Sequence, residues 1–460
     1  MSARHGLIVV GGSDAGIMAG LWARETDPDL PITLIVRDAY PNFSICGIPF
    51  YLSGETPEWP MLAHRTRDDL EATGIRLLLD HEATAIDPQR HTVSVRSPTG
   101  QALELSYDEL VVGTGAVPVR PRLPGIDLPG VHTLHTIHEA RRLHDLIVQK
   151  AARRAVLIGA GYVGTEMADA LTHRGLEVTI VEMAPAVLTT FDPDLGSLVD
   201  AELRRRGVTV ECGKTVERIE LQDDILHVMG SDGLDASGDI VLVAVGVRPY
   251  TELAQHSGIR VNERGAIVVD DRMRTNLEHV WAAGDCVHTH HVLLQEPTYQ
   301  PLGTTAHKQG RVAGINVAGG QARFAGSCGT QSVKIFGLVA ARTGLRDDEA
   351  RAAGFEPISV MVEVDDHKAY YPGATKVHVR MTGDRRTGRL LGVQLLGAYG
   401  AEISKRVDIV AGALYAGLNV EALNELDLSY TPPLSSPWDP IQTAAQTWLR
   451  SVGLEQRASA

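Results

Sequence analysis

Three glycines, Gly159, Gly161 and Gly164, form a GxGxxG turn directly after an apolar run and directly before a helical pattern. In such a turn the first glycine allows the tight bend, the second lets a pyrophosphate approach the backbone, and the third lets the helix pack closely on the strand. The positive end of the following helix adds attraction for the anion. The spacing therefore predicts a dinucleotide-binding site.

An acidic residue follows this turn at the position where it can select the dinucleotide. Glu182 ends the next apolar run, VTIVE. A carboxylate at the end of that strand accepts hydrogen bonds from the adenosine ribose and repels a 2′-phosphate. The sequence therefore favours NADH over NADPH, with NADPH still possible.

A second turn of the same kind lies near the start of the chain. Gly11, Gly12, Ala15 and Gly16 follow the apolar run LIVV, although Ser13 replaces the middle glycine of the pattern. No acid ends the next strand either. Val36 occupies that place, and Asp38 is either a substitute ribose ligand or a solvated loop acid. We interpret this turn as a second nucleotide site.

Cys46 lies in the segment PNFSICGIPFYLSG, at a tight glycine and proline bend that follows the first turn. A cysteine without context is most often a small buried hydrophobic residue, and we interpret Cys212, Cys286 and Cys328 in this way. The four cysteines stand far apart without a CxxC pair. Any cysteine chemistry is therefore that of one thiol.

Several other polar residues have a structural interpretation as well as a functional one. His288, His290 and His291 form an HTHH cluster, but no matching set of cysteines or acids stands nearby, so we expect no metal site. Asp285, in HVWAAGDC, is a second candidate contact for the first nucleotide.

Composition narrows the class of partner. The chain has 460 residues, a formal net charge of −14 and a pI near 5.7, without a basic stripe, which argues against nucleic-acid binding. No apolar run reaches the roughly 18 residues of a membrane span, and the opening residues hold too short an apolar stretch for a signal peptide. We expect a cytoplasmic protein that acts on small molecules.

The elements that position these residues predict an α/β fold. Each glycine turn lies between two apolar strands, which gives two βαβ units and two Rossmann-like, doubly wound sheets. From about residue 325 the pattern changes to longer strands followed by helices from Glu402 and Val420, typical of a separate α+β domain. We predict a discontinuous first domain (1–118 and 250–324), a second domain (119–249) and a C-terminal domain (325–460).

The segments NFSICGIPFYLSG, GAGYVGTE, VWAAGDC and LDLSYTPPLSSPWDP together resemble the pyridine nucleotide-disulfide oxidoreductase family, in its single-cysteine branch. That branch contains coenzyme A-disulfide reductases, NADH oxidases and peroxidases, and persulfide reductases. The likeness covers nearly the whole chain in the same order. It implies an FAD-binding first domain, an NAD(P)H-binding second domain and a C-terminal domain that forms a homodimer.

The resemblance also implies roles for individual residues. Cys46 matches the redox cysteine, Asp285 the acid that holds the FAD ribitol, and Tyr162 an aromatic residue near the nicotinamide. Tyr430, otherwise interpreted with Tyr370 and Tyr371 as a packing aromatic, matches a tyrosine that reaches the active site of the partner subunit. The predicted cofactor contacts are Gly11, Gly12, Ala15, Gly16, Asp38, Thr114, Gly115, Gly159, Gly161, Tyr162, Gly164, Glu166, Glu182, Gly246 and Asp285.

The substrate is less well defined. Coenzyme A-disulfide reductases commonly carry Ser-Phe-x-Asn-Cys at the active turn, whereas this chain has Asn42 at the Ser position and Ile45 before Cys46. Asn42 and His307 are the predicted substrate contacts, and His307 is otherwise interpreted as a helical surface residue. The expected oxidant is a small disulfide, a persulfide or a related thiol compound.

Two alternatives use the same cofactors. In one, Cys46 cycles through a sulfenate and reduces peroxide or oxygen. In the other, the protein delivers electrons to a partner redox protein and the thiol is incidental. For the principal hypothesis we expect Tyr430 to donate the proton to the leaving thiolate, with water as a competitor.

Overall fold

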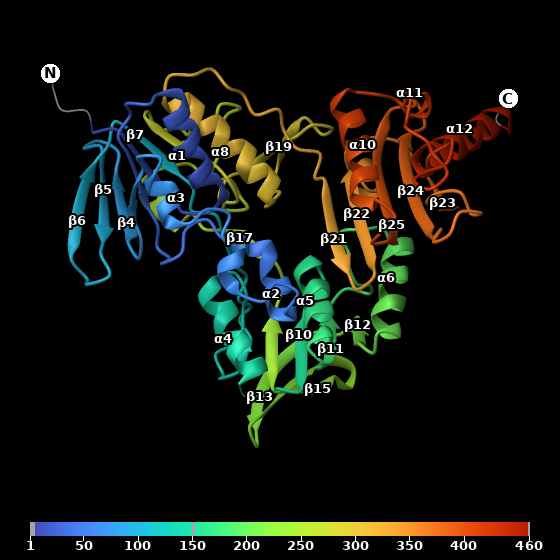
Figure 1. Ribbon diagram of the computed structural model, residues 1–460, viewed down its shortest axis with the longest axis horizontal. Helices are drawn as coiled ribbons and strands as arrows, with labels where there is room; N and C mark the ends of the chain where they lie inside the picture. Colours follow the sequence, from blue (N-terminus) through green and yellow to red (C-terminus); the bar gives the residue numbers. More distant parts are fainter. Residues whose placement is uncertain (1–4, 150–151, 459–460) are drawn as a thin grey trace.

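The structure is a computed structural model that describes residues 5–149 and 152–458, arranged in three parts (Figure 1). The first part is blue with the yellow segment that returns to it, the second lies below in green, and the C-terminal part is orange and red. Each part has a sheet of five strands.

The first part is built on a parallel sheet in the order β18-β7-β1-β2-β3. Its central strands are almost wholly apolar because they lie in a core that helices α1 and α8 share with Ile86, Val93 and Val95 of the antiparallel sheet β4-β5-β6. Strand β18 comes from far along the chain, so the first part is discontinuous. Its elements are β1 (Leu7–Val10), α1 (Asp14–Thr26), β2 (Ile32–Ile35), η1 (Ile45–Gly47), α2 (Ile48–Ser53), η2 (Trp59–Leu62), α3 (Arg67–Glu71), β3 (Arg76–Leu78), β4 (Glu82–Asp87), β5 (Thr92–Arg96), β6 (Ala102–Ser106), β7 (Glu109–Val112), α7 (Glu252–His256), β18 (Val280–Ala282), β19 (Thr289–His291), β20 (Glu296–Thr298) and α8 (Gly303–Val317).

The second part is likewise built on a parallel sheet, with the strand order β12-β11-β10-β16-β9. A short antiparallel pair, β8 with β17, lies where the chain leaves the first part and returns to it. The elements are β8 (Ala116–Pro118), β9 (Val131–His132), α4 (Ile137–Val148), β10 (Arg154–Ile158), α5 (Tyr162–His173), β11 (Glu177–Glu182), α6 (Pro193–Arg205), β12 (Thr209–Cys212), β13 (Val216–Gln222), β14 (Ile225–Gly230), η3 (Ser231–Gly233), β15 (Asp235–Gly238), β16 (Ile240–Val243) and β17 (Val247–Pro249).

The C-terminal part has an antiparallel sheet in the order β21-β22-β25-β24-β23, with helices packed against it. Trp448 of the last helix fills the core and donates its indole N–H to the Ile358 carbonyl oxygen over 2.8 Å. The elements are β21 (Gln331–Ile335), β22 (Leu338–Gly344), α9 (Asp347–Ala352), β23 (Pro357–Asp365), β24 (Lys376–Asp384), β25 (Leu390–Ala398), α10 (Ile403–Tyr415), α11 (Val420–Asn424) and α12 (Pro440–Ala458).

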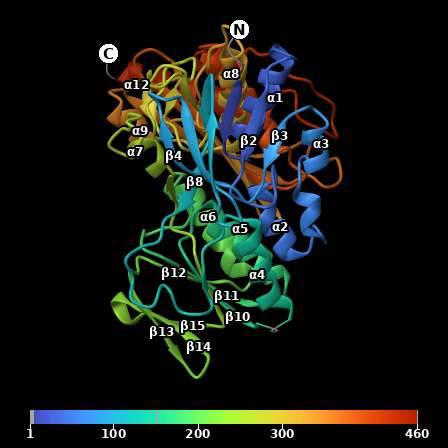
Figure 2. The ribbon, with the colours of Figure 1, turned by 90° about the vertical axis from the view of Figure 1, so that its left-hand side faces the viewer.

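The three parts meet around helix α5. Helix α2, which follows Cys46, packs against α5, and α5 also contacts β21 of the C-terminal part (Figures 1 and 2). Lys334 on β21 joins all three, because its ammonium group lies 3.0 Å from an Asp169 oxygen on α5 and 3.5 Å from a Glu55 oxygen beyond α2. Helix α5, which follows the second glycine turn, is therefore in contact with both the helix that follows Cys46 and the C-terminal part.

Some local expectations differ from the structure. The segment after Cys46 is helical because Pro49 occupies the first turn of α2, where its missing N–H group costs nothing. The first of the strands expected after residue 325 is a pair, β21 and β22, separated by Phe336 with φ of 54° and by Gly337. The helix α12 and the antiparallel sheets β4-β5-β6 and β13-β14-β15 were not expected.

Among the described residues, no helix is both long and apolar enough to cross a membrane.

Candidate functional site

Cys46 lies in the 3-10 turn η1, which leads directly into α2. The Ser44 hydroxyl accepts a hydrogen bond of 3.1 Å from the Gly47 N–H and so closes the turn. Cys46 is exposed, whereas Cys286 and Cys328 are buried and Cys212 is partly buried. The local backbone therefore presents this one thiol at the surface of the chain, ahead of the N-terminus of a helix.

The electrostatic surroundings of the Cys46 thiol oppose its ionisation. Protein atoms crowd the sulfur although the residue is exposed, and this loss of hydration raises the pKa of the thiol. The carboxylates of Glu166, Asp14 and Asp285 raise it further. These three acids come from three separate segments of the chain, so only the fold brings them to the cysteine.

Asp285 follows β18, close to the amino end of α1. Its carboxyl group has no hydrogen bond or ion pair among the described residues. The carboxylate of Asp14 is close enough to repel it. Burial and that repulsion raise the pKa of Asp285 to about 7. The side chain is partly buried, and a carboxyl group that has lost much of its water without gaining a partner is costly unless a ligand satisfies it. Asp285 is thus suited to hold a polar group of a ligand.

The first glycine turn brings the backbone very close to neighbouring elements. A Cβ atom at Gly16 would lie 2.1 Å from the Gly11 carbonyl oxygen, and one at Gly12 would lie 2.4 Å from the Val36 side chain. Val36 therefore packs against the turn and could not be a carboxylate without burying it. Asp38, two residues further, accepts a hydrogen bond of 3.2 Å from the Tyr40 N–H.

The second glycine turn has the same close backbone contact, but the space beside its middle glycine, Gly161, is empty. A Cβ atom at Gly164 would lie 2.0 Å from the Gly159 carbonyl oxygen, whereas one at Gly161 would meet no atom within 4 Å. Glu182 accepts hydrogen bonds from the N–H groups of Ala160, over 2.7 Å, and Ala184, over 2.8 Å. The predicted ribose acid is therefore fixed beside the turn.

Tyr162 and Glu166 occupy the first turns of α5, which starts at the second glycine turn. Burial raises the pKa of Tyr162 to about 12 and, with repulsion from Asp169, the pKa of Glu166 to about 7. Tyr162 lies edge-on to Phe191. Because the Glu166 carboxylate also raises the pKa of the Cys46 thiol, α5 connects the second glycine turn with the cysteine.

Thr114, Gly115 and Gly246 lie at the crossing between the first two parts. The Thr114 hydroxyl donates a hydrogen bond of 2.5 Å to the Tyr250 carbonyl oxygen, and the Tyr250 N–H donates one of 2.9 Å to the Gly115 carbonyl oxygen. Gly115 and Gly246 have φ values of 70° and 111°, which favour glycine.

The predicted substrate residues lie in different surroundings. Asn42 is 1% exposed, and its side-chain oxygen has no hydrogen-bond partner among the described residues. His307, on α8, lies 3.1 Å from an Asp14 oxygen and is partly exposed. Both roles stay predictions.

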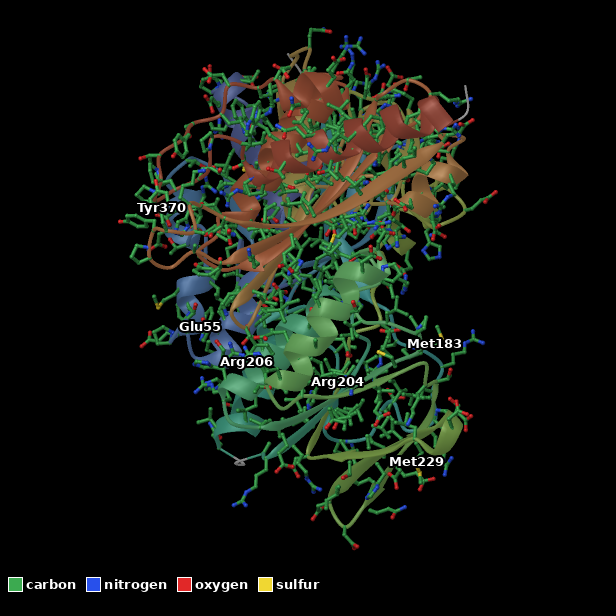
Figure 3. All side chains as sticks on the ribbon, turned by 90° about the vertical axis from the view of Figure 1, so that its right-hand side faces the viewer. Glu55, Met183, Arg204, Arg206, Met229 and Tyr370 are labelled. Carbon is green, nitrogen blue, oxygen red and sulfur yellow. The ribbon has the colours of Figure 1, made fainter. Side chains whose placement is uncertain are left out.

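Tyr430 is exposed on the C-terminal part, as is Tyr370, which projects from its edge (Figure 3). Their segments are adjacent, because the Lys368 N–H donates a hydrogen bond of 3.2 Å to the Pro432 carbonyl oxygen. No described interaction joins Tyr430 to Cys46 within the chain.

Asp14 and Lys334 were missed by the sequence analysis. Asp14 fills a variable position of a glycine turn and Lys334 an ordinary strand position, so their residue types carry no local signal. Their contacts with α8 and α5 exist only in the folded chain. A cleft of about 660 Å³ lined in part by Glu109, His279 and Trp281 contains none of the predicted site residues.

The residues present fit two nucleotides. Open space at Gly161 and the fixed carboxylate of Glu182 suit a nicotinamide dinucleotide at the second turn. The carboxyl group of Asp285, which has no hydrogen-bond partner among the described residues, suits a polar group of a flavin nucleotide at the first turn. Such a fold and site define a redox enzyme that uses FAD and NAD(P)H.

The chain belongs to the pyridine nucleotide-disulphide oxidoreductase family, which it matches over residues 5–322, and it matches that family's dimerisation domain over residues 330–440. The NAD(P)H sulfur oxidoreductase (CoA-dependent) of Pyrococcus furiosus is 32% identical over 441 residues, which cover 96% of this chain and 98% of the relative. The NADH oxidase of Methanocaldococcus jannaschii is 31% identical over 97% of this chain and 99% of the relative.

Solved structures are similar as well. The NAD-dependent persulfide reductase of A. fulgidus has a TM-score of 0.94 and 36% identity over 97% of this chain and 83% of that chain. The water-forming NADH oxidase of Lactobacillus brevis has a TM-score of 0.93 and 27% identity over 98% of this chain and 99% of that chain. The predicted fold class, family and cofactors are confirmed.

Proposed function

We propose that this enzyme takes electrons from NADH and delivers them through FAD to Cys46, which reduces a small disulfide, a persulfide or a related thiol compound. The observation that carries the proposal is the position of Cys46: it is the exposed cysteine of the described chain, on a turn that leads into a helix packed against the nicotinamide-binding part. Relatives named sulfur oxidoreductase, persulfide reductase and coenzyme A disulfide reductase support the substrate class.

The residues around the two predicted cofactor sites bind different parts of NADH and FAD. Bound FAD supplies the capacity to accept a hydride and pass electrons to sulfur. Glu182 positions the adenosine ribose of NADH, and its charge disfavours NADPH. Asp285 accepts a hydrogen bond from FAD, and the glycine turns hold the two pyrophosphates at helix N-termini.

At Cys46 the thiolate attacks the disulfide or persulfide sulfur, so that an S–S bond forms at Cys46 while the former S–S bond breaks. The released thiolate takes one proton. Two electrons then break the S–S bond at Cys46 and return its thiolate, and the sulfur that it carried leaves with a second proton, as a thiol from a disulfide substrate or as hydrogen sulfide from a persulfide. Tyr430 of a partner subunit is the proposed proton donor, in competition with water.

A homodimer follows from the same proposal. The dimerisation-domain match supports a self-association surface on the C-terminal part, and so do its exposed large hydrophobic residues Tyr370, Tyr399, Leu434 and Trp438. Tyr430 lies on that part, so a dimer would let it complete the partner's site. The domain boundaries near residues 118, 250 and 325 and the cytoplasmic location stay predictions.

An anaerobic NADH titration followed by visible absorbance tests the proposal. The wild type should take up two electrons before full flavin reduction and show a long-wavelength thiolate-to-flavin band. Cys46→Ser should lack both and lose at least a thousandfold in disulfide or persulfide turnover, whereas Cys212→Ser should behave like the wild type. Identical flavin-only reduction of wild type and Cys46→Ser would overturn the proposal and favour electron delivery to a partner protein.

The second candidate is an NADH oxidase or peroxidase that uses a Cys46 sulfenate, favoured by the named relative from Methanocaldococcus jannaschii. It needs the same thiol, so Cys46→Ser does not separate the two. Comparing peroxide and oxygen consumption with disulfide and persulfide turnover in one preparation does. The proposed function requires kcat/KM for a sulfur substrate to exceed that for peroxide.

A further inference from the structure

The loop of residues 183–192, between β11 and α6, lies against the second glycine turn. Leu188 donates its N–H over 2.8 Å to the carbonyl oxygen of Ala160, which stands between the first two glycines of that turn. Three residues further along, the Phe191 ring lies edge-on to the Tyr162 ring, with the ring centres 6.3 Å apart. Both apolar loop residues are buried. The loop therefore packs behind the first residue of α5.

The C-terminal part of the molecule holds the second half of this loop. Arg342, on β22, donates a hydrogen bond of 2.5 Å from its guanidinium group to the Thr190 carbonyl oxygen. Arg346, the residue before α9, donates one of 2.9 Å to the Thr189 carbonyl oxygen. Glu349 accepts hydrogen bonds from both guanidinium groups, over 2.7 and 3.3 Å. The two arginines are therefore bound to a loop that lies 152 and 157 residues away along the chain.

The end of the loop has further contacts with the same sheet. Asp192 donates its N–H to the side-chain oxygen of Gln394 over 2.7 Å, and the Gln394 amide donates back to an Asp192 carboxylate oxygen over 2.6 Å. Arg380 donates to that same oxygen over 3.0 Å. Since Leu188, at the start of the half-loop, is bonded to the glycine turn itself, the C-terminal part acts on residues 189–192.

The Arg342 side chain is well suited to fix this loop. It is 8% exposed, and its guanidinium group also donates to the Gly344 carbonyl oxygen over 2.8 Å. The donors of a guanidinium group lie in one rigid plane, so a group bound to two carbonyl oxygens and a carboxylate cannot shift without breaking hydrogen bonds. Because Phe191 directly follows Thr190, this anchor also fixes the ring that packs on Tyr162.

Tyr162 lies where one half of a bound dinucleotide has to pass. In this type of sheet the pyrophosphate binds outside the carboxyl ends of the strands, at the N-terminus of the helix that follows the glycine turn. The empty space beside Gly161 suits it. A dinucleotide with its adenosine ribose at Glu182 extends its nicotinamide half to the other side of that helix end. The nicotinamide half therefore passes the first residue of α5, which is Tyr162.

We propose that Arg342 is a positioning residue for hydride transfer: by fixing the loop behind Tyr162, it holds that ring where it aligns the nicotinamide of NADH with the flavin. Arg346 supports the same loop through one hydrogen bond. Hydride transfer converts NADH and FAD to NAD⁺ and FADH⁻, and it needs the reacting atoms about 3 to 3.5 Å apart, so a misplacement of about 1 Å costs about a hundredfold in rate. The inference rests on the proposed function for the place of NADH at the second glycine turn.

Anaerobic stopped-flow reduction of the bound FAD by NADH tests the inference, because this half-reaction involves no sulfur substrate. Arg342→Met should lower the limiting rate constant of flavin reduction about tenfold or more. Two readouts should stay unchanged: reduction by dithionite, which does not use the nicotinamide site, and the inhibition constant of ADP-ribose, which lacks the nicotinamide. Arg351→Met is the matched control and should leave every value unchanged, because Arg351 is exposed on α9 and pairs with Asp348.

Phe191→Leu shows whether the effect of Arg342 passes through the Phe191 ring. It should slow flavin reduction in the same way, and the double variant should be no slower than the slower single variant. If the two effects multiply instead, the loop is not the route.

An Arg342→Met enzyme that is reduced as fast as the wild type, or that loses ADP-ribose affinity as strongly as its reduction rate, would overturn the inference, because a purely structural contact would give either result. If this variant does not fold, Arg346→Met decides: the rate constant should fall about threefold, and an unchanged value would overturn the inference. Loss of the Cys46 signal in the NADH titration would reject the proposed function and leave these results standing.

Discussion

Glu182 is a single side chain that should decide the choice of nicotinamide coenzyme. Its carboxylate is held by the N–H groups of Ala160 and Ala184 at the edge of the second glycine turn. The exposed Met183 beside it, visible at the edge of the second part in Figure 3, brings no positive charge that could bind a 2′-phosphate.

Glu182→Ala should therefore lower kcat/KM for NADH about tenfold and raise kcat/KM for NADPH. The ratio of the two values should change by about a hundredfold or more in favour of NADPH. Steady-state kinetics with both coenzymes measure this ratio. Glu177→Gln, at the other, exposed end of the same strand, is the matched control and should leave the ratio unchanged. An unchanged ratio in Glu182→Ala would show that this carboxylate does not contact the ribose.

Glu166 should make stability depend on pH. Its folded-state pKa is raised from 4.5 to about 7, first by burial and then by Asp169. The unfolded chain releases this proton first, so the contribution of Glu166 to stability is fully present below about pH 4.5 and is lost as the pH rises through about 7.

Glu166→Gln removes this loss and should stabilise the protein at pH 8 by up to about 3 kcal/mol, with a much smaller gain at pH 5. Thermal unfolding at both pH values, compared with wild type and Glu177→Gln, measures the difference. A gain of equal size at both pH values would point to packing rather than to the carboxyl proton.

At the scale of elements, the contact between α1 and α8 depends on glycine. At Gly310 even a methyl group would collide with the Ala15 carbonyl oxygen, which is backbone and cannot rotate away. Gly310→Ala should destabilise the protein by about 2 kcal/mol and lower its FAD content, because α1 begins at the first glycine turn.

Gly412, within α10, gives the matched control, since a Cβ atom there meets open space. Gly412→Ala should leave FAD content unchanged and stabilise the helix by about 0.5 to 1 kcal/mol. Thermal unfolding and the flavin-to-protein absorbance ratio measure both effects. If Gly310→Ala kept full FAD and full stability, the helix contact would be looser than described.

At the scale of the whole molecule, a hybrid dimer separates roles within and between subunits. Co-expression of a Cys46→Ser subunit with a Tyr430→Phe subunit, each with a different affinity tag, gives a dimer with both changes. If Tyr430 serves the partner's cysteine, one site of the hybrid carries both changes and the other is intact, so half of the wild-type turnover should return.

If Tyr430 serves its own subunit, the hybrid has one site without the cysteine and one without the phenol, so turnover should not exceed half of that of the Tyr430→Phe homodimer. Analytical ultracentrifugation of the purified hybrid verifies that it is a dimer. A monomeric wild type would exclude the partner role of Tyr430 altogether.

Local sequence signals determined much of this protein. The glycine spacings with their flanking strands indicated both nucleotide turns, and the structure has the two parallel sheets at those positions. The resemblance supplied the family, the cofactors and the roles proposed for Cys46, Asp285 and Tyr430. Short-range patterns of this kind are readable because a turn, a strand or a helix start depends on neighbours along the chain.

Tertiary structure alone decided which distant residues meet. Asp14 reaches His307 because Gly310 and Gly314 let α8 lie on α1, and Lys334 joins three parts because β21 passes beside α5. Neither pair has a pattern along the chain. Charge acts through space, so the acidity of Cys46 depends on this packing rather than on the residues next to it in sequence.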